Sequence, residues 1–270
     1  MDPAGVIHAL EVARKVAASL TPFLMKGYRS GTRVEKKGAI DLVTEYDRGA
    51  EAQIRAQLLG AFPDHRIIGE EAPEEGVGER VWYVDPIDGT TNFAHGHPFF
   101  CVSLALYEGP VPLVGVVSAP ALGVTWWAAR GEGAFRNDDR CRVSSTERLD
   151  DALCATGFPY DRWIADDDNL REHRAFLKRS RGVRRCGAAA LDLCLVADGT
   201  YDLYWEQRLK PWDMGAGALL VLEAGGTLTD YDGLGADPRR GRLVASNGKV
   251  HGEALSVLRE ARGALGLPRG

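Results

Sequence analysis

Two carboxylates separated by two residues mark the segment 81–93. The apolar run Val81-Trp82-Tyr83-Val84 is typical of a buried strand and is followed by Asp85-Pro86-Ile87-Asp88-Gly89-Thr90-Thr91. Pro86 fixes its own φ and Gly89 relaxes the steric limits on the backbone, so we expect the strand to end at Asp85 and the chain to turn there. Asp85 and Asp88 would then point into one volume, where two anions repel each other unless a cation lies between them. Mg²⁺ suits such a site because it is a hard cation that prefers oxygen ligands.

Two further acidic motifs stand at expected element boundaries. Glu70 and Glu71 follow the short apolar run Ile67-Ile68-Gly69, and Asp213 lies in Pro211-Trp212-Asp213 ahead of a stretch of small residues. Asp-Pro-x-Asp-Gly alone could be only a polar turn, because Asp, Pro and Gly favour turns for local reasons. Three acid-bearing boundaries favour a metal site over that alternative.

These motifs resemble those of the inositol monophosphatase family, in the same order over nearly the whole chain. The matching segments are Gly69-Glu70-Glu71, Asp85 to Phe93 and Pro211-Trp212-Asp213, supported by residues 41–47, 187–192 and 204–206. The resemblance implies an α+β / α/β fold, the layered αβαβα sandwich of the sugar phosphatase type, shared by fructose-bisphosphatase and inositol monophosphatase. It places the site in the cleft between two halves of the chain.

The resemblance also implies how the metal ions are held. Glu70, Asp85 and the Ile87 carbonyl would bind one Mg²⁺, and Asp85, Asp88 and Asp213 would bind a second. Two ions about 3.5–4 Å apart can stabilise the attacking and leaving oxygens of an in-line displacement together. The implied catalytic residues are Asp47 and Thr90, which orient and deprotonate the attacking water, together with Glu70.

Substrate contacts are likewise implied by the resemblance. Glu206 would accept a hydrogen bond from a ring hydroxyl, and Ala189 would contact the same ring through its backbone; the full implied set is Asp88, Gly89, Thr90, Thr91, Ala189, Glu206 and Asp213. Thr91 could instead cap a helix. Lys36 matches a lysine near the site waters, although Lys36 and Lys37 could equally be a solvated pair in a loop. Ala188 stands where many relatives carry Thr or Ser, which puts one substrate hydrogen bond in doubt.

The expected activity is Mg²⁺-dependent, lithium-sensitive hydrolysis of myo-inositol monophosphate to inositol and phosphate by metal-activated water attack. Related phosphatases act on histidinol phosphate, fructose 1,6-bisphosphate, NADP or 3′-phosphoadenosine 5′-phosphate, and these substrates remain alternatives. Haloacid dehalogenase phosphatases use Asp-x-Asp-Gly-Thr, but here the spacing is one residue longer and contains Pro86. A non-enzymatic role in binding RNA or protein through the basic cluster of residues 178–185 is a third alternative.

Composition excludes several other classes of protein. The 270 residues carry 38 acidic and 33 basic side chains, a formal charge of −5, which gives no general attraction to nucleic acid or anionic membranes. Five scattered cysteines without C-x-x-C spacing predict neither a disulfide framework nor a zinc site. Because no signal sequence or bilayer-length apolar run is visible, we expect a cytoplasmic protein, and the resemblance implies a homodimer.

Periodicity predicts the elements that position these residues. Apolar spacing favours helices over residues 3–26 and 44–59, with Asp47 in the first turn of the second. Short links predict antiparallel strands over 101–107, 113–117 and 124–128. Beyond residue 145, strands near 153–156, 201–205 and 243–246 alternate with helices near 167–179, 188–197, 214–223 and 250–262, the first capped by Asp166, Asp167 and Asp168. We therefore expect an α+β half at 1–145 with an antiparallel sheet and most metal ligands, and an α/β half at 146–270 supplying Asp213 and substrate contacts.

Overall fold

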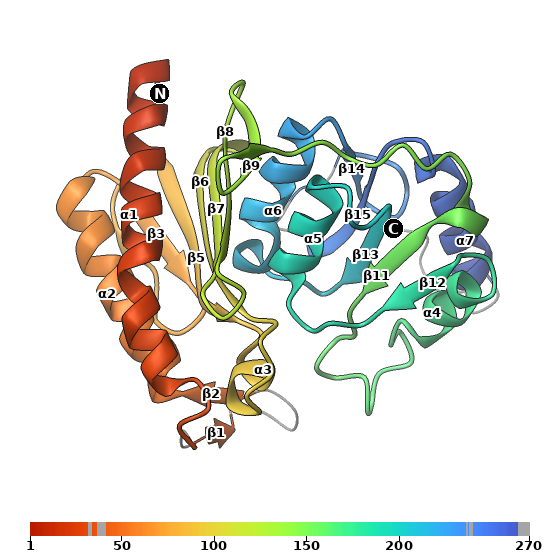
Figure 1. Cartoon of the computed structure of the whole chain (residues 1–270), viewed down its shortest axis with the longest axis horizontal. Helices are drawn as coiled ribbons and strands as arrows, with labels where there is room; N and C mark the ends of the chain where they lie inside the picture. Colours follow the sequence, from red (N-terminus) through yellow and green to blue (C-terminus); the bar gives the residue numbers. More distant parts are fainter. Residues whose placement is uncertain (32–33, 37–41, 236, 238–239, 264–270) are drawn as a thin grey trace.

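The chain folds into five alternating layers of helices and sheets (Figure 1). The computed structural model describes residues 1–31, 34–36, 42–235, 237 and 240–263. Helices α1 (Pro3–Gly27) and α2 (Glu45–Ala61) form the first layer, and an eight-stranded sheet forms the second. Helices α5 (Ala189–Ala197) and α6 (Pro211–Glu223) form the middle layer. A five-stranded sheet and the helices α4 (Leu170–Leu177) and α7 (His251–Gly263) complete the αβαβα arrangement that the resemblance implied.

The eight-stranded sheet is mostly antiparallel. Its order is β10-β9-β8-β7-β6-β5-β3-β4, and only β3 and β5 pair in parallel. The strands are β3 (Arg66–Gly69), β4 (Glu75–Gly76), β5 (Arg80–Asp88), β6 (Cys101–Glu108), β7 (Val111–Ala119), β8 (Val124–Ala129), β9 (Gly133–Arg136) and β10 (Asp139–Arg140). Because β3 and β5 run in parallel side by side, the acidic residues at their carboxyl ends lie at the same edge of the sheet.

The five-stranded sheet is mixed and has the order β12-β11-β13-β15-β14. Strand β11 pairs in parallel with β12 and β13, whereas β15 pairs antiparallel with β13 and β14. The strands are β11 (Leu153–Thr156), β12 (Gly182–Arg184), β13 (Leu203–Gln207), β14 (Thr227–Thr229) and β15 (Arg242–Ser246). The smaller elements are the paired strands β1 (Val34–Lys36) and β2 (Leu42–Thr44), the helix α3 (Thr90–Ala94) and the 3-10 helix η1 (Leu149–Asp151).

Three apolar clusters lie between the layers. The helices α1 and α2 bury one face against the first sheet, whereas α5 and α6 are buried on nearly all sides because a sheet covers each face. Small residues make this middle layer possible. A Cβ at Gly217 of α6 would lie 2.4 Å from Leu193 Cβ of α5, and one at Gly115 of β7 would lie 2.7 Å from the Ala216 carbonyl. The small-residue stretch after Asp213 therefore brings the helix that carries this acid close to its neighbours.

The predicted helices and strands are confirmed in type and order. The first sheet uses residues up to Arg140 and the second begins at Leu153, on either side of the expected boundary at 145. Whether the halves 1–145 and 146–270 are separate domains stays a prediction. All five cysteines are free thiols.

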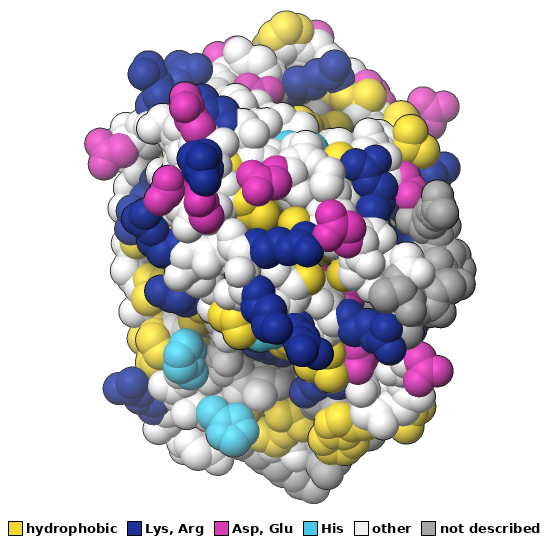
Figure 2. Space-filling view, turned by 90° about the vertical axis from the view of Figure 1, so that its right-hand side faces the viewer, with side chains coloured by type: hydrophobic (Ala, Val, Ile, Leu, Met, Phe, Trp, Pro, Cys, Tyr) yellow, Lys and Arg dark blue, Asp and Glu magenta, His cyan; other side chains and the backbone are white. Residues whose placement is uncertain are grey.

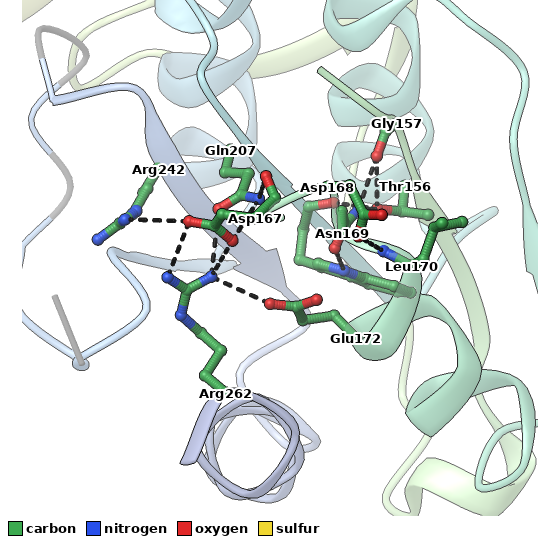
Figure 3. A network of polar contacts seen from close by, with 11 residues as sticks. Thr156, Gly157, Asp167, Asp168, Asn169, Leu170, Glu172, Gln207, Arg242 and Arg262 are labelled. Atoms are coloured by element: carbon green, nitrogen blue, oxygen red, sulfur yellow. Dashed lines mark hydrogen bonds and ion pairs between the residues drawn. The ribbon is translucent and has the colours of Figure 1, made fainter. Parts of the chain in front are cut away.

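Residues 166–168 differ from the predicted helix cap (Figure 3). Only Asp168 contacts the start of α4, by accepting from the Leu170 backbone N–H at 2.9 Å. Asp167 instead pairs with Arg262 of α7 at 2.8 Å and accepts from Gln207 of β13 at 2.9 Å. The cap prediction was wrong for Asp167 because a distant arginine, invisible to local sequence, supplies a stronger partner. The contact fixes the segment before α4 to the end of β13.

Candidate active site

One cavity brings together most of the predicted site residues. It has a volume of about 260 Å³ and is lined by residues from β5, β13, the first turns of α5 and α6, and the loop after β11. Nine predicted residues line it: Glu70, Asp85, Ile87, Asp88, Gly89, Thr90, Ala189, Glu206 and Asp213. Of the other predicted residues whose side chains are described, Asp47 and Thr91 are not among its lining residues.

The segment from Asp85 to Asp88 continues β5 and does not form a turn after it. Asp85 pairs with Ser103, and Asp88 pairs with Cys101. The chain therefore advances three residues on β5 and only two on β6, so β5 carries one extra residue in a β-bulge. This irregularity accommodates Pro86, which has no N–H to donate. The expected end of the strand at Asp85 was therefore wrong, and the chain turns at Gly89. Both carboxylates still reach the cavity because the bulge re-aims them.

Asp85 and Asp88 are buried acids whose neighbours are also acids. Burial, followed by the charges of Glu70 and Asp88, raises the pKa of Asp85 well above its usual range. For Asp88, burial and then the charge of Asp213 raise the pKa, against the hydrogen bond from the Ala190 N–H at 2.7 Å. Neither carboxylate forms an ion pair with a basic side chain within the described residues. Their ionised forms would therefore be stabilised by a bound cation.

A buried ion pair on α2 holds the turn that contains Glu70. Glu51 accepts from Arg55 at 2.8 Å and from the backbone N–H groups of Glu71 and Ala72 at 2.8 and 3.0 Å. Glu51 lies so close to β3 that a Cβ on Gly69 would be 2.6 Å from its carboxylate oxygen. The turn that follows β3 is thus fixed by α2, and Glu70 is held at the cavity wall.

Asp213 lies in the first turn of α6. Its carboxylate accepts from the Lys210 backbone N–H at 2.6 Å, and Pro211 occupies the first turn, where its missing N–H costs no hydrogen bond. Asp213 is therefore oriented by the helix start, where negative charge is also stabilised by the helix dipole.

Thr90 links the cavity to Asp47. Its hydroxyl lies 2.9 Å from Asp47 Oδ1 and 3.0 Å from the Ile87 carbonyl oxygen. Asp47 is fully buried, and its Oδ2 accepts from the Thr44 N–H at 2.7 Å in the capping box of α2. A hydroxyl carries one proton, so Thr90 can donate to only one of its two acceptors at a time. Asp47 does not itself line the cavity but contacts Thr90, which does.

Gly89 occupies the cap position of α3 with φ of 92° and leaves no capping role for Thr91. The left-handed backbone at Gly89 makes the reversal, α3 has no side-chain cap, and the Thr91 side chain is exposed. The alternative of Thr91 as a cap was therefore wrong. Lys36 lies in β1, opposite Leu42, and not in a loop as one alternative held; its side chain and all of Lys37 lie outside the described residues.

Glu206 of β13 lines the same cavity. Its carboxylate accepts from the Tyr204 hydroxyl and lies against Gly157, where a Cβ would be 2.1 Å from Glu206 Oε2. Burial raises the pKa of Glu206 to about 7, although the Tyr204 hydrogen bond and the charge of Arg185 act in the opposite direction. Ala189 is the first residue of α5, and its backbone N–H donates to Asp88 at 3.3 Å. Ala188 is 2 % exposed and lines the cavity, and its side chain is a methyl group that cannot supply the hydrogen bond of a Thr or Ser hydroxyl.

The donor chemistry fits a hard divalent cation. Six acidic residues line the cavity. Four of them, Glu70, Asp85, Asp88 and Asp213, are predicted metal ligands together with the carbonyl of Ile87, and all of these donors would be oxygens, as Mg²⁺ prefers. Within the part of the chain that the structure describes, no three Asp, Glu, His or Cys side chains are grouped closely enough to form a preformed metal cage. The fit therefore rests on the shared cavity, the kind of donor and the raised pKa values of Asp85 and Asp88.

Sequence reasoning missed several residues of the site. Arg185 lines the cavity outside all of the quoted segments, and Asp192 lines it from a quoted segment without having been given a role. Asn92 donates to the carbonyl oxygens of Phe99 at 2.7 Å and Cys186 at 2.9 Å. Asn92 thereby joins the segment after β5 to the segment before α5. Asn92 and Asp192 lie in segments quoted for the resemblance, so their position was the one available signal.

The five-layer fold and the acidic cavity define a phosphatase of the sugar phosphatase type. The chain belongs to the inositol monophosphatase family, whose sequence model matches residues 7–263.

Three of its relatives illustrate the different names found in the family. The chain is 42% identical over 260 residues to an inositol-1-monophosphatase of Synechocystis sp., covering 95% of this chain and 91% of that protein. It is 46% identical over 232 residues to the Nus factor SuhB of Pseudomonas aeruginosa, covering 83% and 85%. It is 38% identical over 258 residues to a fructose-1,6-bisphosphatase/inositol-1-monophosphatase of Thermotoga maritima, covering 95% and 98%.

Solved structures agree in fold. An IMPase of Thermotoga maritima matches with a TM-score of 0.89 and 38% identity, over 96% of this chain and 100% of that one. An IMPase/NADP phosphatase complexed with Mg²⁺ and phosphate matches with a TM-score of 0.83 and 25% identity, over 94% and 95%. Among the described residues, no helix is both long and apolar enough to cross a bilayer.

Proposed function

We propose that this phosphatase hydrolyses myo-inositol monophosphate to inositol and phosphate in a Mg²⁺-dependent reaction. The observation that carries the proposal is that one cavity is lined both by the acids Glu70, Asp85, Asp88 and Asp213 and by Glu206. The first four acids suit the phosphoryl end of the substrate once cations are bound, and Glu206 suits a hydroxyl-bearing leaving group.

Glu70, Asp85, Asp88, Asp213 and the Ile87 carbonyl would hold the ions. Bound Mg²⁺ would lower the pKa of the attacking water and offset the charge of the phosphoryl group. That a homologous fold has been solved as a complex with Mg²⁺ and phosphate supports this assignment.

Thr90 and Asp47 would handle the proton of the attacking water. If the Thr90 hydroxyl donates to Asp47, its lone pairs are free to accept from water, and the proton passes toward the buried carboxylate. The starts of α5 and α6 would help to orient the metal-binding acids. The N–H groups of Ala189 and Ala190 donate to Asp88, and the N–H of Lys210 donates to Asp213. Ala189 and Glu206 would contact the leaving group.

A panel of esters tests the proposal. The purified chain with Mg²⁺ should release phosphate from myo-inositol monophosphate with a higher kcat/KM than from fructose 1,6-bisphosphate, NADP, histidinol phosphate or 3′-phosphoadenosine 5′-phosphate. A higher value for any of these four would reject the inositol assignment while leaving the phosphatase activity intact.

Inhibition by lithium, a homodimer and a cytoplasmic location stay predictions. The small Li⁺ ion could replace one Mg²⁺ among Asp85, Asp88 and Asp213. Light scattering on the purified chain would test the dimer, for which the expected mass is twice the 29.3 kDa of the chain.

A non-enzymatic role is the second candidate, because one relative is named as a Nus factor. Figure 2 shows many Lys and Arg side chains on one face, interspersed with acidic ones. Two arginines of the basic cluster are already paired, Arg179 with Glu260 at 2.7 Å and Arg181 with Asp151 at 2.5 Å. This pairing reduces the charge offered to RNA, so we expect only weak, salt-sensitive binding in a titration with labelled single-stranded RNA.

A further inference from the structure

Asp192 is a buried acid that the proposed chemistry does not use. Its side chain is 1 % exposed, lines the active cavity and has an oxygen, Oδ1, without a hydrogen-bond partner in the described part of the chain. Buried polar atoms nearly always have partners, and an exception calls for a specific explanation.

The position of Asp192 relates it to the leaving-group side of the cavity. It lies three residues after Ala189 on α5, so both residues share one face of the helix. Burial first, and then the charge of Glu206, raise the pKa of Asp192 well above its usual range. Two carboxylates from different elements, α5 and β13, thus line one cavity, close enough for the charge of Glu206 to act on Asp192.

No neighbouring side chain in the described part of the chain fully neutralises the two acids Asp192 and Glu206. Arg185 lines the cavity and its charge lowers the pKa of both Asp192 and Glu206, but the described residues show no ion pair within 4 Å between Arg185 and either acid. Tyr204 donates its one hydroxyl proton to Glu206, so it does not serve Asp192. A buried acid that accepts no hydrogen bond destabilises the fold. Proteins retain such a residue where a bound ligand donates the missing hydrogen bond.

We propose that Asp192 is a substrate-specificity residue that, with Glu206, forms a pair of acceptors for two hydroxyl groups of the leaving group. The substrate class that this pair selects is a polyol monophosphate with at least two free hydroxyls near the ester. Leaving groups without donors, or with a second anionic group at this position, leave one or both acids unpaired. The inference rests on the proposed phosphatase function and refines its substrate class.

The test compares Asp192→Asn with the wild type on three esters. Myo-inositol monophosphate and glycerol 2-phosphate both offer hydroxyls, whereas p-nitrophenyl phosphate offers none. We expect kcat/KM for the two polyol esters to fall about tenfold, mainly through KM, because the amide replaces one acceptor oxygen of Asp192 by a donor group. For p-nitrophenyl phosphate the change should stay within about twofold. Asp192→Ser provides a smaller replacement if the asparagine variant does not fold.

A stability measurement separates this role from a structural one. Because Asp192 lacks a partner for Oδ1, the substrate-free Asp192→Asn variant should melt at a higher temperature than the wild type. The matched control is Asp150→Asn, which removes the same charge from a surface residue, 58% exposed in its side chain, and should change neither the melting temperature nor the ratio between esters.

Two results would overturn the inference. Equal losses on all three esters together with a lower melting temperature would show that Asp192 supports the fold, and unchanged kinetics on all three would show that it contacts no substrate. Failure of the wild type to hydrolyse inositol monophosphate would refute the proposed substrate alone, because glycerol 2-phosphate against p-nitrophenyl phosphate still decides the role of Asp192.

Discussion

Replacing Glu206 by Gln should change the pH dependence of turnover on a polyol ester. The carboxylate has a pKa of about 7, so about one tenth of it is ionised at pH 6 and about nine tenths at pH 8. A charged acceptor is worth about 1.4 kcal/mol more than a neutral one, which is about tenfold in kcat/KM. The ratio of wild type to Glu206→Gln should therefore rise from about 2 at pH 6 to about 9 at pH 8.

The assay is kcat/KM for myo-inositol monophosphate at half-unit steps between pH 6 and 8. Using the ratio at each pH cancels the titration of the substrate and of groups common to both enzymes. Tyr204→Phe is the control that keeps the acid: because the Tyr204 hydrogen bond lowers the pKa of Glu206, its loss should move the midpoint above 7. A ratio that stays flat with pH, or falls, would refute the assignment of Glu206 as a charged acceptor.

The raised pKa of Glu206 also makes the stability of the fold depend on pH. The folded-state pKa of Glu206 lies above that of an exposed glutamate, so its ionisation opposes folding. The stability that the fold has while Glu206 is protonated is fully present below about pH 4.5 and is lost as the pH rises through about 7. Thermal melts should therefore show the wild type losing stability relative to Glu206→Gln over that window, in the absence of substrate.

Four further outcomes are expected. Asp85→Asn and Asp213→Asn should fold but lose turnover at saturating Mg²⁺, because each removes charge that must hold a cation; near wild-type rates in either would count against the metal assignment. Thr90→Val should lower kcat by about a hundredfold or more, and Thr90→Ser should restore most of it if the hydroxyl carries the proton. Gly157→Ala should weaken turnover of inositol monophosphate more than of p-nitrophenyl phosphate, since the new Cβ would overlap the Glu206 carboxylate; equal effects would argue against it. Millimolar Li⁺ should inhibit more than equal K⁺, and equal inhibition would reject lithium sensitivity.

The sequence predicted those parts of the site that local motifs carry. Asp85 and Asp88 end a strand and Asp213 lies at the start of a helix, both elements with strong patterns, and Thr90 follows Asp88 by only two residues. The strand boundary at Asp85 was wrong because a β-bulge absorbs a proline that sequence rules assign to a turn. Such a bulge depends on the register with β6, which no local pattern reports.

Long-range partners could not be predicted. Glu51 orders the turn beside Glu70 from another helix, and Arg262 draws Asp167 away from the helix start across 95 residues. Asp192 looks like an ordinary acid in a helix, and only its burial and missing partner single it out. These features arise from packing between layers, which periodicity does not specify.

The central claim, a Mg²⁺-dependent phosphatase acting on a polyol ester, is tested most directly by removing and restoring the metal. Protein treated with a chelator and then desalted should release no phosphate from myo-inositol monophosphate and should recover activity when Mg²⁺ is added back. Calorimetry on the same protein should show Mg²⁺ binding that Asp213→Asn weakens. Undiminished hydrolysis after complete chelation, or unchanged Mg²⁺ binding in Asp213→Asn, would contradict the account.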